Sequence, residues 1–178
     1  MKEYKIVFTG SPGAGKTTAI QAISDSTALS TDVANSDASL DKAMTTVGMD
    51  FGVISLEGGE RVRLFGTPGQ SRFDFMWTIL AKDAMGIVFL VDNSRPAPLE
   101  DLGLYLDGFG AHLGTAACVV GVGRTDTNSQ PDLDAYASLL HSRSLLFPVV
   151  AADVRRRDDV QMLVELLLVQ MEGMETPA

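Results

Sequence analysis

A glycine-rich segment that ends in lysine and threonine is the clearest chemical signal in the sequence. Residues 10–17 read GSPGAGKT and satisfy the pattern G-x-x-x-x-G-K-[ST]. Glycines let such a loop wrap so that successive backbone N–H groups point inward, and a helix that follows it adds its positive N-terminal end. The segment therefore predicts a phosphate-binding loop.

The polar residues of this loop have distinct expected roles. Lys16 brings a compact cation to the β and γ phosphates of a nucleotide, and the Thr17 hydroxyl can ligate Mg²⁺. Pro12 lacks an N–H and fixes φ, so it stiffens the loop. A tight turn capped by Thr17 is the alternative, but a turn has no need of the lysine. The residues expected to bind the nucleotide here are Gly10, Ser11, Gly13, Ala14, Gly15, Lys16, Thr17 and Thr18.

Strand and helix patterns position this loop. Residues 4–9 form a short apolar run that ends at the first glycine, and residues 16–24 carry apolar side chains at helical spacing. Residues 51–56 and 61–65 are separated by a turn containing Gly-Gly, which favours an antiparallel hairpin. Further along the chain we expect strands at 85–91, 117–122 and 146–151, and helices at 99–113, 133–142 and 159–171.

This alternation of strands and helices predicts an α/β fold of the P-loop NTPase class. We expect a doubly wound, mostly parallel six-stranded sheet with one antiparallel strand and helices on both faces, as a single domain over residues 1–178. In such sheets ligands bind beyond the carboxyl ends of the strands. The loops expected to share this edge follow Thr9, Phe65, Val91, Val122 and Ala151.

Composition and charge narrow the classes of function. The chain is 46% apolar and 21% charged, as folded globular proteins are, and its formal charge of -9 argues against a nucleic-acid partner or an anionic membrane surface. Cys118 lies in an apolar run and is expected to be a buried core thiol. No signal peptide, lipidation motif or apolar run of about 18 residues is present, so we expect a cytoplasmic protein without a direct membrane anchor.

Two further segments resemble parts of the Ras-superfamily small GTPases. TTVGMDF, residues 45–51, resembles the switch I segment of Rab and Arf proteins, and GTPGQ, residues 66–70, resembles the start of switch II. The overall pattern is most similar to the bacterial Ras-like GTPases, including the gliding-motility polarity type. The resemblance implies a G domain that binds GTP or GDP together with Mg²⁺.

Roles in catalysis follow from this resemblance. Thr46 matches the switch I threonine that binds Mg²⁺ and contacts the γ phosphate, and Gly69 matches the glycine that senses the γ phosphate. Gln70 matches the glutamine that orients the attacking water. The resemblance thus assigns catalysis to Gln70, Lys16 and Thr46, and binding of the metal to Thr17 and Thr46.

Two positions depart from the family pattern. The first residue of the usual D-x-x-G is Gly66, so we expect weaker binding of Mg²⁺ unless another acid, such as Asp50, already replaces the missing carboxylate. Residues 123–126 read GRTD in place of N-K-x-D. Asp126 keeps the carboxylate that pairs with guanine, Arg124 can stack on the base, and the backbone of Val154 is available to guanine O6. A glycine at position 123 cannot tie this loop to the phosphate loop.

The expected function is slow hydrolysis of GTP by a conformational switch that signals to regulatory and effector proteins through its switch regions. An apolar stretch, Phe73, Phe75, Met76 and Trp77, either packs onto the sheet or forms part of a partner-binding patch. The alternatives are a nucleotide-locked adaptor with little turnover, a P-loop ATPase, and a P-loop small-molecule kinase. A kinase of this kind would need an arginine-rich lid segment, and none is apparent in the sequence.

Overall fold

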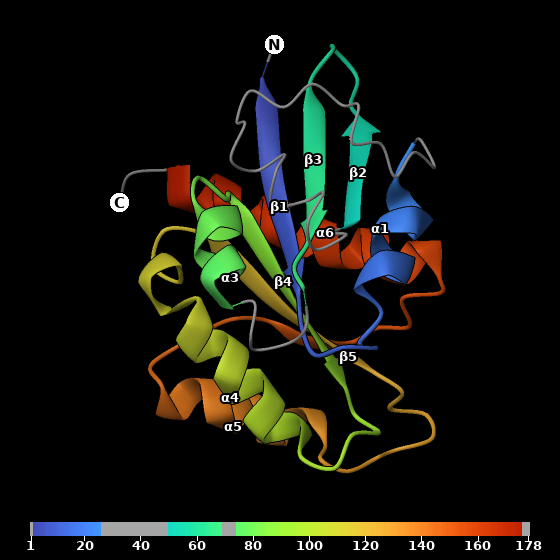
Figure 1. The fold of residues 1–178 in the computed structure, drawn as a ribbon, viewed down its shortest axis with the longest axis vertical. Coiled ribbons are helices and arrows are strands. Elements are labelled where there is room, and N and C mark those ends of the chain that lie inside the picture. Colours follow the sequence, from blue (N-terminus) through green and yellow to red (C-terminus); the bar gives the residue numbers. More distant parts are fainter. Residues whose placement is uncertain (1, 26–49, 69–73, 176–178) are drawn as a thin grey trace.

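The computed structural model describes residues 2–25, 50–68 and 74–175 of the chain (Figure 1). Within these ranges six strands form one sheet in the order β2-β3-β1-β4-β5-β6. The strands are β1 Glu3–Thr9, β2 Asp50–Ser55, β3 Arg61–Gly66, β4 Gly86–Asp92, β5 Ala117–Gly123 and β6 Val149–Ala151. β2 runs antiparallel to β3, and every other neighbouring pair is parallel. The predicted α/β P-loop NTPase fold is confirmed.

Helices cover both faces of this sheet. They are α1 Lys16–Ile23, α3 Asp74–Ala81, α4 Pro98–Gly108, α5 Leu133–Ser142 and α6 Arg157–Glu175, with a 3₁₀ turn at Gly110–His112. Figure 1 shows α1 and α6 against one face and α3, α4 and α5 against the other, and each face has its own cluster of buried apolar side chains. No helix in the described ranges combines the length and the apolarity that crossing a bilayer requires.

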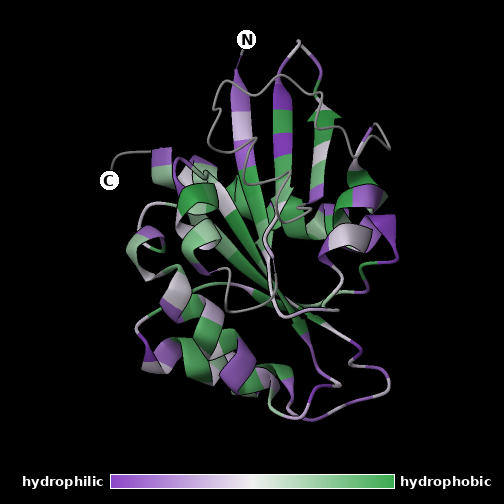
Figure 2. Cartoon of the chain, in the orientation of Figure 1, coloured by the Kyte–Doolittle hydropathy of each residue, from purple (hydrophilic) through white to green (hydrophobic). Residues whose placement is uncertain are grey.

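Burial follows the position of each strand in the sheet. All seven residues of β4, the strand between β1 and β5, are buried, as expected of a parallel strand covered on both faces. Figure 2 shows the apolar colour concentrated where β1, β4 and β5 meet the helices, while the N-terminal ends of β1 and β3 are polar. The carboxyl ends of the parallel strands lie at one edge, and there the Thr67 hydroxyl donates to the Thr9 hydroxyl at 2.8 Å.

Several elements differ in extent from the prediction, and α6, predicted at 159–171, runs from Arg157 to Glu175. β6 begins at Val149, three residues later than predicted, because Pro148 has no N–H to give to a ladder. The helix predicted to reach residue 113 ends as α4 at Gly108 and is followed by the 3₁₀ turn. A Cβ at Gly108 would lie 2.5 Å from the ring of Trp77, so glycine, a poor helix former, is required where the indole packs.

α3 is a further difference, since the resemblance to switch II places its apolar stretch in a loop rather than a helix. Met76 and Trp77 are 2% and 1% exposed and belong to the core, whereas Phe75 is 58% exposed. The Trp77 ring lies parallel to that of Phe109 with centroids 5.8 Å apart, and its Nε1 donates to Pro68 O at 2.9 Å. Of the two alternatives for this stretch, packing is therefore correct for Met76 and Trp77, while Phe73 lies outside the described residues.

Candidate nucleotide-binding site

Three glycines shape the phosphate loop between β1 and α1. Gly10, Gly13 and Gly15 have φ values of 150°, 80° and 102°, which side chains rarely permit. A Cβ at Gly10 would lie 2.2 Å from Leu90 O, and one at Gly15 would lie 2.5 Å from Cγ2 of Val154. A Cβ at Gly13 would meet nothing within 4 Å. Packing thus fixes the two ends of the loop and leaves its middle open to a ligand.

The N-terminus of α1 is open to an anion. The helix begins at Lys16, and its N-cap residue, Gly15, provides no side-chain hydrogen bond. No acidic side chain lies in the first turn, and Thr17 and Thr18 are exposed there. Free N–H groups and the positive end of the helix dipole favour a bound phosphate at this point.

Lys16 lies inside the loop that precedes it. Its side chain is largely buried, and Nζ donates to Gly10 O at 2.6 Å and to Ser11 O at 2.9 Å. Burial lowers the pKa of Lys16 to about 8, against the opposing effect of Asp50. The loop therefore holds an ammonium group that is poorly solvated, which is the state in which an added phosphate charge interacts most strongly.

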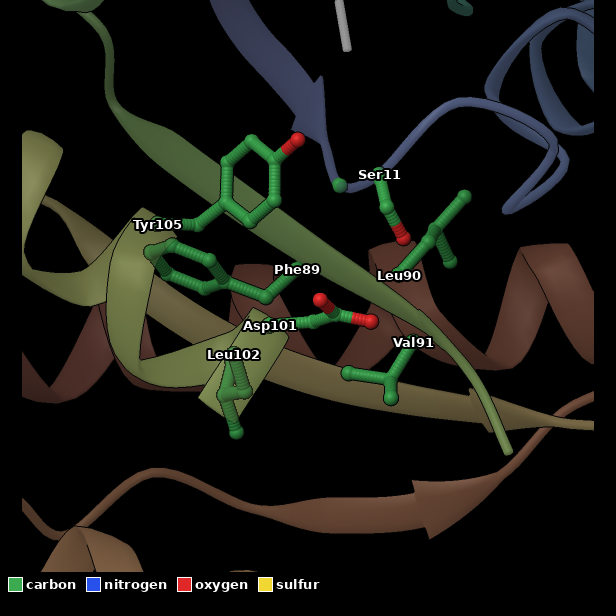
Figure 3. A pocket seen from close by; sticks show the side chains of 8 residues that line it. Ser11, Phe89, Leu90, Val91, Asp101, Leu102 and Tyr105 are labelled. Carbon is green, nitrogen blue, oxygen red and sulfur yellow. The ribbon is translucent and has the colours of Figure 1, made fainter. Parts of the chain in front are cut away.

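Ser11 and Ala14, both predicted to bind the nucleotide as part of the phosphate loop, have buried side chains. Ser11 is 4% exposed, and Figure 3 shows its hydroxyl behind the loop, in a narrow space bounded by β4 and α4. The side chains that fill this space with it include Phe89 and Tyr105. The backbone N–H of Ala14 donates to Ser11 O at 3.0 Å, within the loop. The Ser11 side chain therefore faces the protein interior, and binding of the nucleotide by Ser11 and Ala14 stays a prediction.

A carboxylate lies beside Thr17 although position 66 is glycine. Asp50 and Gly66 are paired in the antiparallel register of β2 and β3. The Thr17 hydroxyl donates to Oδ2 of Asp50 at 2.5 Å. A Cβ at Gly66 would lie 3.1 Å from the Cβ of Asp50 and 3.3 Å from its Oδ2. The acid that is absent from Gly66 is therefore supplied by the neighbouring strand, at nearly the same place.

At the other end of the site, Arg124 links two loops. Its Nη1 forms a 2.5 Å ion pair with Oδ2 of Asp92, which ends β4, and donates to Gly13 O at 3.5 Å. Its φ of 59° is unusual for a residue with a side chain. The guanidinium of Arg124 thus reaches the phosphate loop at Gly13, and its stacking on the base stays a prediction.

Asp126 follows Arg124 by two residues in the chain, and Val154 lies beside the phosphate loop. Asp126 is exposed, and its charge interacts with that of Arg155, which forms a 2.8 Å ion pair with Asp153. The hydrogen bonds from Arg155 lower the pKa of Asp153 to about 2. Val154 contacts the phosphate loop at Gly15. The structure thus brings together the phosphate loop and the residues predicted to read the base.

Three predicted site residues, Thr46, Gly69 and Gln70, lie outside the described residues. Two residues of the site were not predicted, Asp92 and Asn93, which adjoin the loop of Arg124 and Asp126. They lie at the carboxyl end of a completely buried strand, and polar residues at this place in a sequence indicate a ligand site. In the described part of the chain, no three His, Cys, Asp or Glu side chains gather as a metal site.

One protein family and several known proteins are similar to parts of this chain. Residues 30–103 match the family described as conserved hypothetical ATP binding protein. An uncharacterized protein of Methanocaldococcus jannaschii is 28% identical over 99 residues, which are 56% of this chain and 57% of that protein. The Ras-related protein Rab-12 of Homo sapiens is 28% identical over 103 residues, or 56% of this chain and 38% of Rab-12.

The Ras-related protein Rab-10 of Diplobatis ommata is 28% identical over 112 residues, 61% of this chain and 50% of Rab-10. The chain thus spans only about 38% to 57% of the length of these relatives. The similarity, the fold and the phosphate loop together identify a P-loop nucleotide-binding protein that is similar to Ras-like GTPases.

Proposed function

We propose that this protein binds a guanine nucleotide with Mg²⁺, hydrolyses GTP slowly to GDP and phosphate, and signals the change to protein partners. The observation that carries the proposal is the arrangement at the open phosphate loop, where the buried Lys16 ammonium and the Thr17–Asp50 pair both lie at the N-terminus of α1. The similarity to Rab proteins supports the choice of nucleotide and reaction.

Residues fit to hold Mg²⁺ are present. The Thr17 hydroxyl and the Asp50 carboxylate lie 2.5 Å apart, and oxygen ligands of these two kinds are what Mg²⁺ binds together with phosphate. Bound there, Mg²⁺ supplies charge that stabilises the phosphates during transfer. Asp50 orients the hydroxyl of Thr17 and provides the negative charge that Gly66 cannot provide.

Moving the carboxylate tests this role of Asp50. We expect Asp50→Ala to weaken the dependence of nucleotide release on Mg²⁺, and the double variant Asp50→Ala/Gly66→Asp to restore it, since the two side chains occupy nearly the same place. Gly66→Asp alone should change it little, because Asp50 already supplies the carboxylate. Release rates measured against Mg²⁺ concentration decide the matter, and an Asp50→Ala variant with unchanged rates contradicts the proposal.

Asp126 is the residue proposed to select guanine. A carboxylate can accept from the N1–H and 2-amino groups of guanine, whereas adenine presents an acceptor at N1. Such a mismatch costs about 1–3 kcal/mol, or roughly 5- to 150-fold in affinity. We expect GDP to bind more tightly than ADP, and Asp126→Ala to remove the difference.

ATP is the second candidate, because the matched family is described as ATP binding. Denaturing freshly purified protein and identifying the released nucleotide by chromatography separates the two. Guanine nucleotide supports the proposal, and adenine nucleotide replaces it with an ATP-binding function at the same phosphate loop.

Slow hydrolysis is proposed because catalysis depends on positioning and on neutralising charge on the γ oxygens. Lys16 supplies charge, while Gln70 is assigned to the attacking water and needs a partner to hold it. In relatives, an inserted arginine and an ordered glutamine can together raise the rate by about 10³ to 10⁵, and we propose that a partner of this protein orders Gln70. Pro12 is exposed on the loop beside Gly13, where its ring would obstruct an inserted arginine.

Single-turnover hydrolysis of bound GTP tests this step. We expect slow turnover of the isolated protein and a further loss in Gln70→Ala, with nucleotide affinity retained. Fast unassisted hydrolysis contradicts the need for a partner, and no detectable hydrolysis favours a nucleotide-locked adaptor. For the partner surface, Phe75 is 58% exposed on α3, whereas the buried Met76 and Trp77 cannot contribute.

A further inference from the structure

We infer that Asp92 and Asn93 are positioning residues for nucleoside recognition. They hold the loop of residues 123–131, a role that the asparagine of N-K-x-D would have and that Gly123, at its position, cannot perform. This segment, called the base loop below, carries Arg124 and Asp126. The inference rests on the proposed nucleotide-binding function and specifies what organises one end of that site.

Gly123 is not required by crowding or by backbone conformation. A Cβ there would lie 3.5 Å from Val91 O and 3.6 Å from Ala152 O, which are ordinary contacts, and its φ is not positive. A side chain could therefore be accommodated, yet glycine provides none. The base loop must be anchored by groups from another element.

Asn93 provides three such anchors from a buried position. It is 3% exposed, and its backbone N–H donates to Gly123 O at 3.1 Å. Its side-chain Nδ2 donates to Asn128 O at 2.5 Å and to Pro131 O at 3.1 Å. One residue at the end of β4 thus contacts the base loop at its beginning, its middle and its end.

Tyr136 of α5 fixes the orientation of the Asn93 amide. Its hydroxyl donates to Oδ1 of Asn93 at 2.5 Å, and its side chain is fully buried. Burial raises the pKa of Tyr136 to about 12, so the hydroxyl stays a donor at neutral pH. With Oδ1 engaged as the acceptor, both protons of Nδ2 face the base loop.

Asp92 completes the arrangement through Arg124. Its Oδ2 pairs with the guanidinium at 2.5 Å, and its Oδ1 accepts from the backbone N–H of Ser94 at 2.9 Å. Although partial burial opposes ionisation, the hydrogen bonds from Ser94 and Arg124 lower the pKa of Asp92. Because Arg124 also donates to Gly13 O at 3.5 Å, Asp92 connects the base loop to the phosphate loop.

Inorganic tripolyphosphate separates the two parts of the site, since it can occupy the phosphate loop but has no nucleoside. The test compares its affinity with that of whichever of GDP and ADP binds the wild type more tightly. We expect Asn93→Ala and Asp92→Asn to weaken binding of the nucleotide about tenfold or more and to leave tripolyphosphate binding unchanged. Tyr136→Phe keeps the Nδ2 donors and should have a smaller effect of the same kind.

Two matched variants control for general loss of stability. Gln170→Ala removes another amide that bonds backbone groups of β5, at the opposite end of that strand. Tyr4→Phe removes a hydroxyl that donates to Glu60 at 3.3 Å, also far from the base loop. Both should bind the nucleotide and tripolyphosphate as the wild type does.

The possible outcomes separate this inference from the proposed function. Equal losses for both ligands in Asn93→Ala, or no loss, would overturn the positioning role. Wild-type protein that binds tripolyphosphate as tightly as either nucleotide would overturn it too, while leaving phosphate binding intact. Wild-type protein that binds none of the three ligands would overturn the proposed function itself.

Discussion

Lys16 shows how one residue can be prepared for a ligand by the backbone around it. The ammonium group lies within a loop whose glycine conformations leave Gly10 O and Ser11 O facing it. These two carbonyls hold the charge in place but solvate it less well than water, as the lowered pKa of about 8 indicates. A phosphate would provide the opposite charge that the loop itself does not.

Lys16→Met tests this interpretation, because methionine keeps much of the stem and removes only the charge. We expect nucleotide affinity to fall by about 1.5–3 kcal/mol, roughly 10- to 150-fold, since hydrogen bonds to charged groups contribute that much. The measurement is a fluorescence titration with a labelled nucleotide, and circular dichroism should show an unchanged fold. Affinity equal to that of the wild type would contradict the assignment of the phosphate loop.

Cys118, the single cysteine, provides a pH-dependent prediction. Its thiol is fully buried, and burial raises its pKa from 9.0 to about 12. Above about pH 9 the unfolded thiol ionises while the folded thiol does not, so the free energy of unfolding falls as the pH rises from 9 towards 12. We expect the free energy of unfolding, measured with urea at pH 8 and pH 10, to fall less in Cys118→Ala than in the wild type. Equal decreases in both proteins would mean that other groups cause it.

The residues of the site differ in how far the sequence could predict them. Lys16 and Thr17 follow from a local motif, so their position needed no knowledge of the fold. Asp50 lies beside Gly66 only because β2 and β3 pair in one register, and a one-residue shift would turn it to the other face. Asn93 meets the base loop through parallel pairing of β4 and β5. Such contacts depend on tertiary register, which local spacing does not encode.

Among the elements, the N-terminal part of β5 is hydrogen-bonded by a side chain of α6, because β6 does not extend that far. β6 pairs with β5 only from Val120 onward. At Cys118, the Gln170 side chain of α6 accepts from the backbone N–H at 3.3 Å and donates to the backbone O at 2.9 Å. One amide therefore replaces the pair of hydrogen bonds that a longer β6 would have made.

Gln170→Leu should remove both bonds while keeping the size of the side chain. We expect a loss of about 1–3 kcal/mol in the free energy of unfolding, because two backbone groups of β5 lose their partners. Urea unfolding measures this loss, and faster alkylation of Cys118 in the folded protein should accompany it. Gln161→Leu, at an exposed position of the same helix, is the control. Similar losses in both variants would contradict the proposed support.

The elements that periodicity predicted well are those with a single strong pattern. The helix at 133–142 has the predicted bounds, and the sheet contains all six predicted strands. α3 was not predicted, because the resemblance to switch II placed the apolar stretch in a loop, although Met76, Trp77, Leu80 and Ala81 recur at helical spacing. The extent of β6 was misjudged because an apolar run continues through Pro148, which hydropathy alone does not exclude.

On the scale of the whole molecule, the site lies at the carboxyl ends of the parallel strands, where several loops meet. Gly10 contacts β4, Gly15 contacts Val154, and Arg124 connects the base loop to Gly13. A nucleotide bound along this edge would contact segments that follow β1, β3, β4, β5 and β6. Its binding free energy should therefore stabilise the folded chain as a unit.

Thermal unfolding provides the corresponding prediction. With GDP and Mg²⁺ at a hundred times the dissociation constant, stabilisation should reach about 2.7 kcal/mol, which raises Tm by roughly 5–10 °C for a chain of this size. Differential scanning calorimetry measures the shift. Under the same conditions Lys16→Met, with its affinity reduced 10- to 150-fold, should keep only about 0.3–1.4 kcal/mol of this stabilisation, and an equal shift in the variant would indicate binding elsewhere.

Two stretches of strand edge in the described sheet are closed by groups outside the sheet. Gln170 covers β5 at Cys118, and on β2 the backbone N–H of Asp25 donates to Val53 O at 2.9 Å while Ser55 N donates to the Asp25 carboxylate. Unpaired strand edges recruit strands from other chains. The side chains of Asp25 and Gln170 thus also limit aggregation. Replacing either one would leave backbone groups of a strand unpaired, and a strand of another copy could then pair with them.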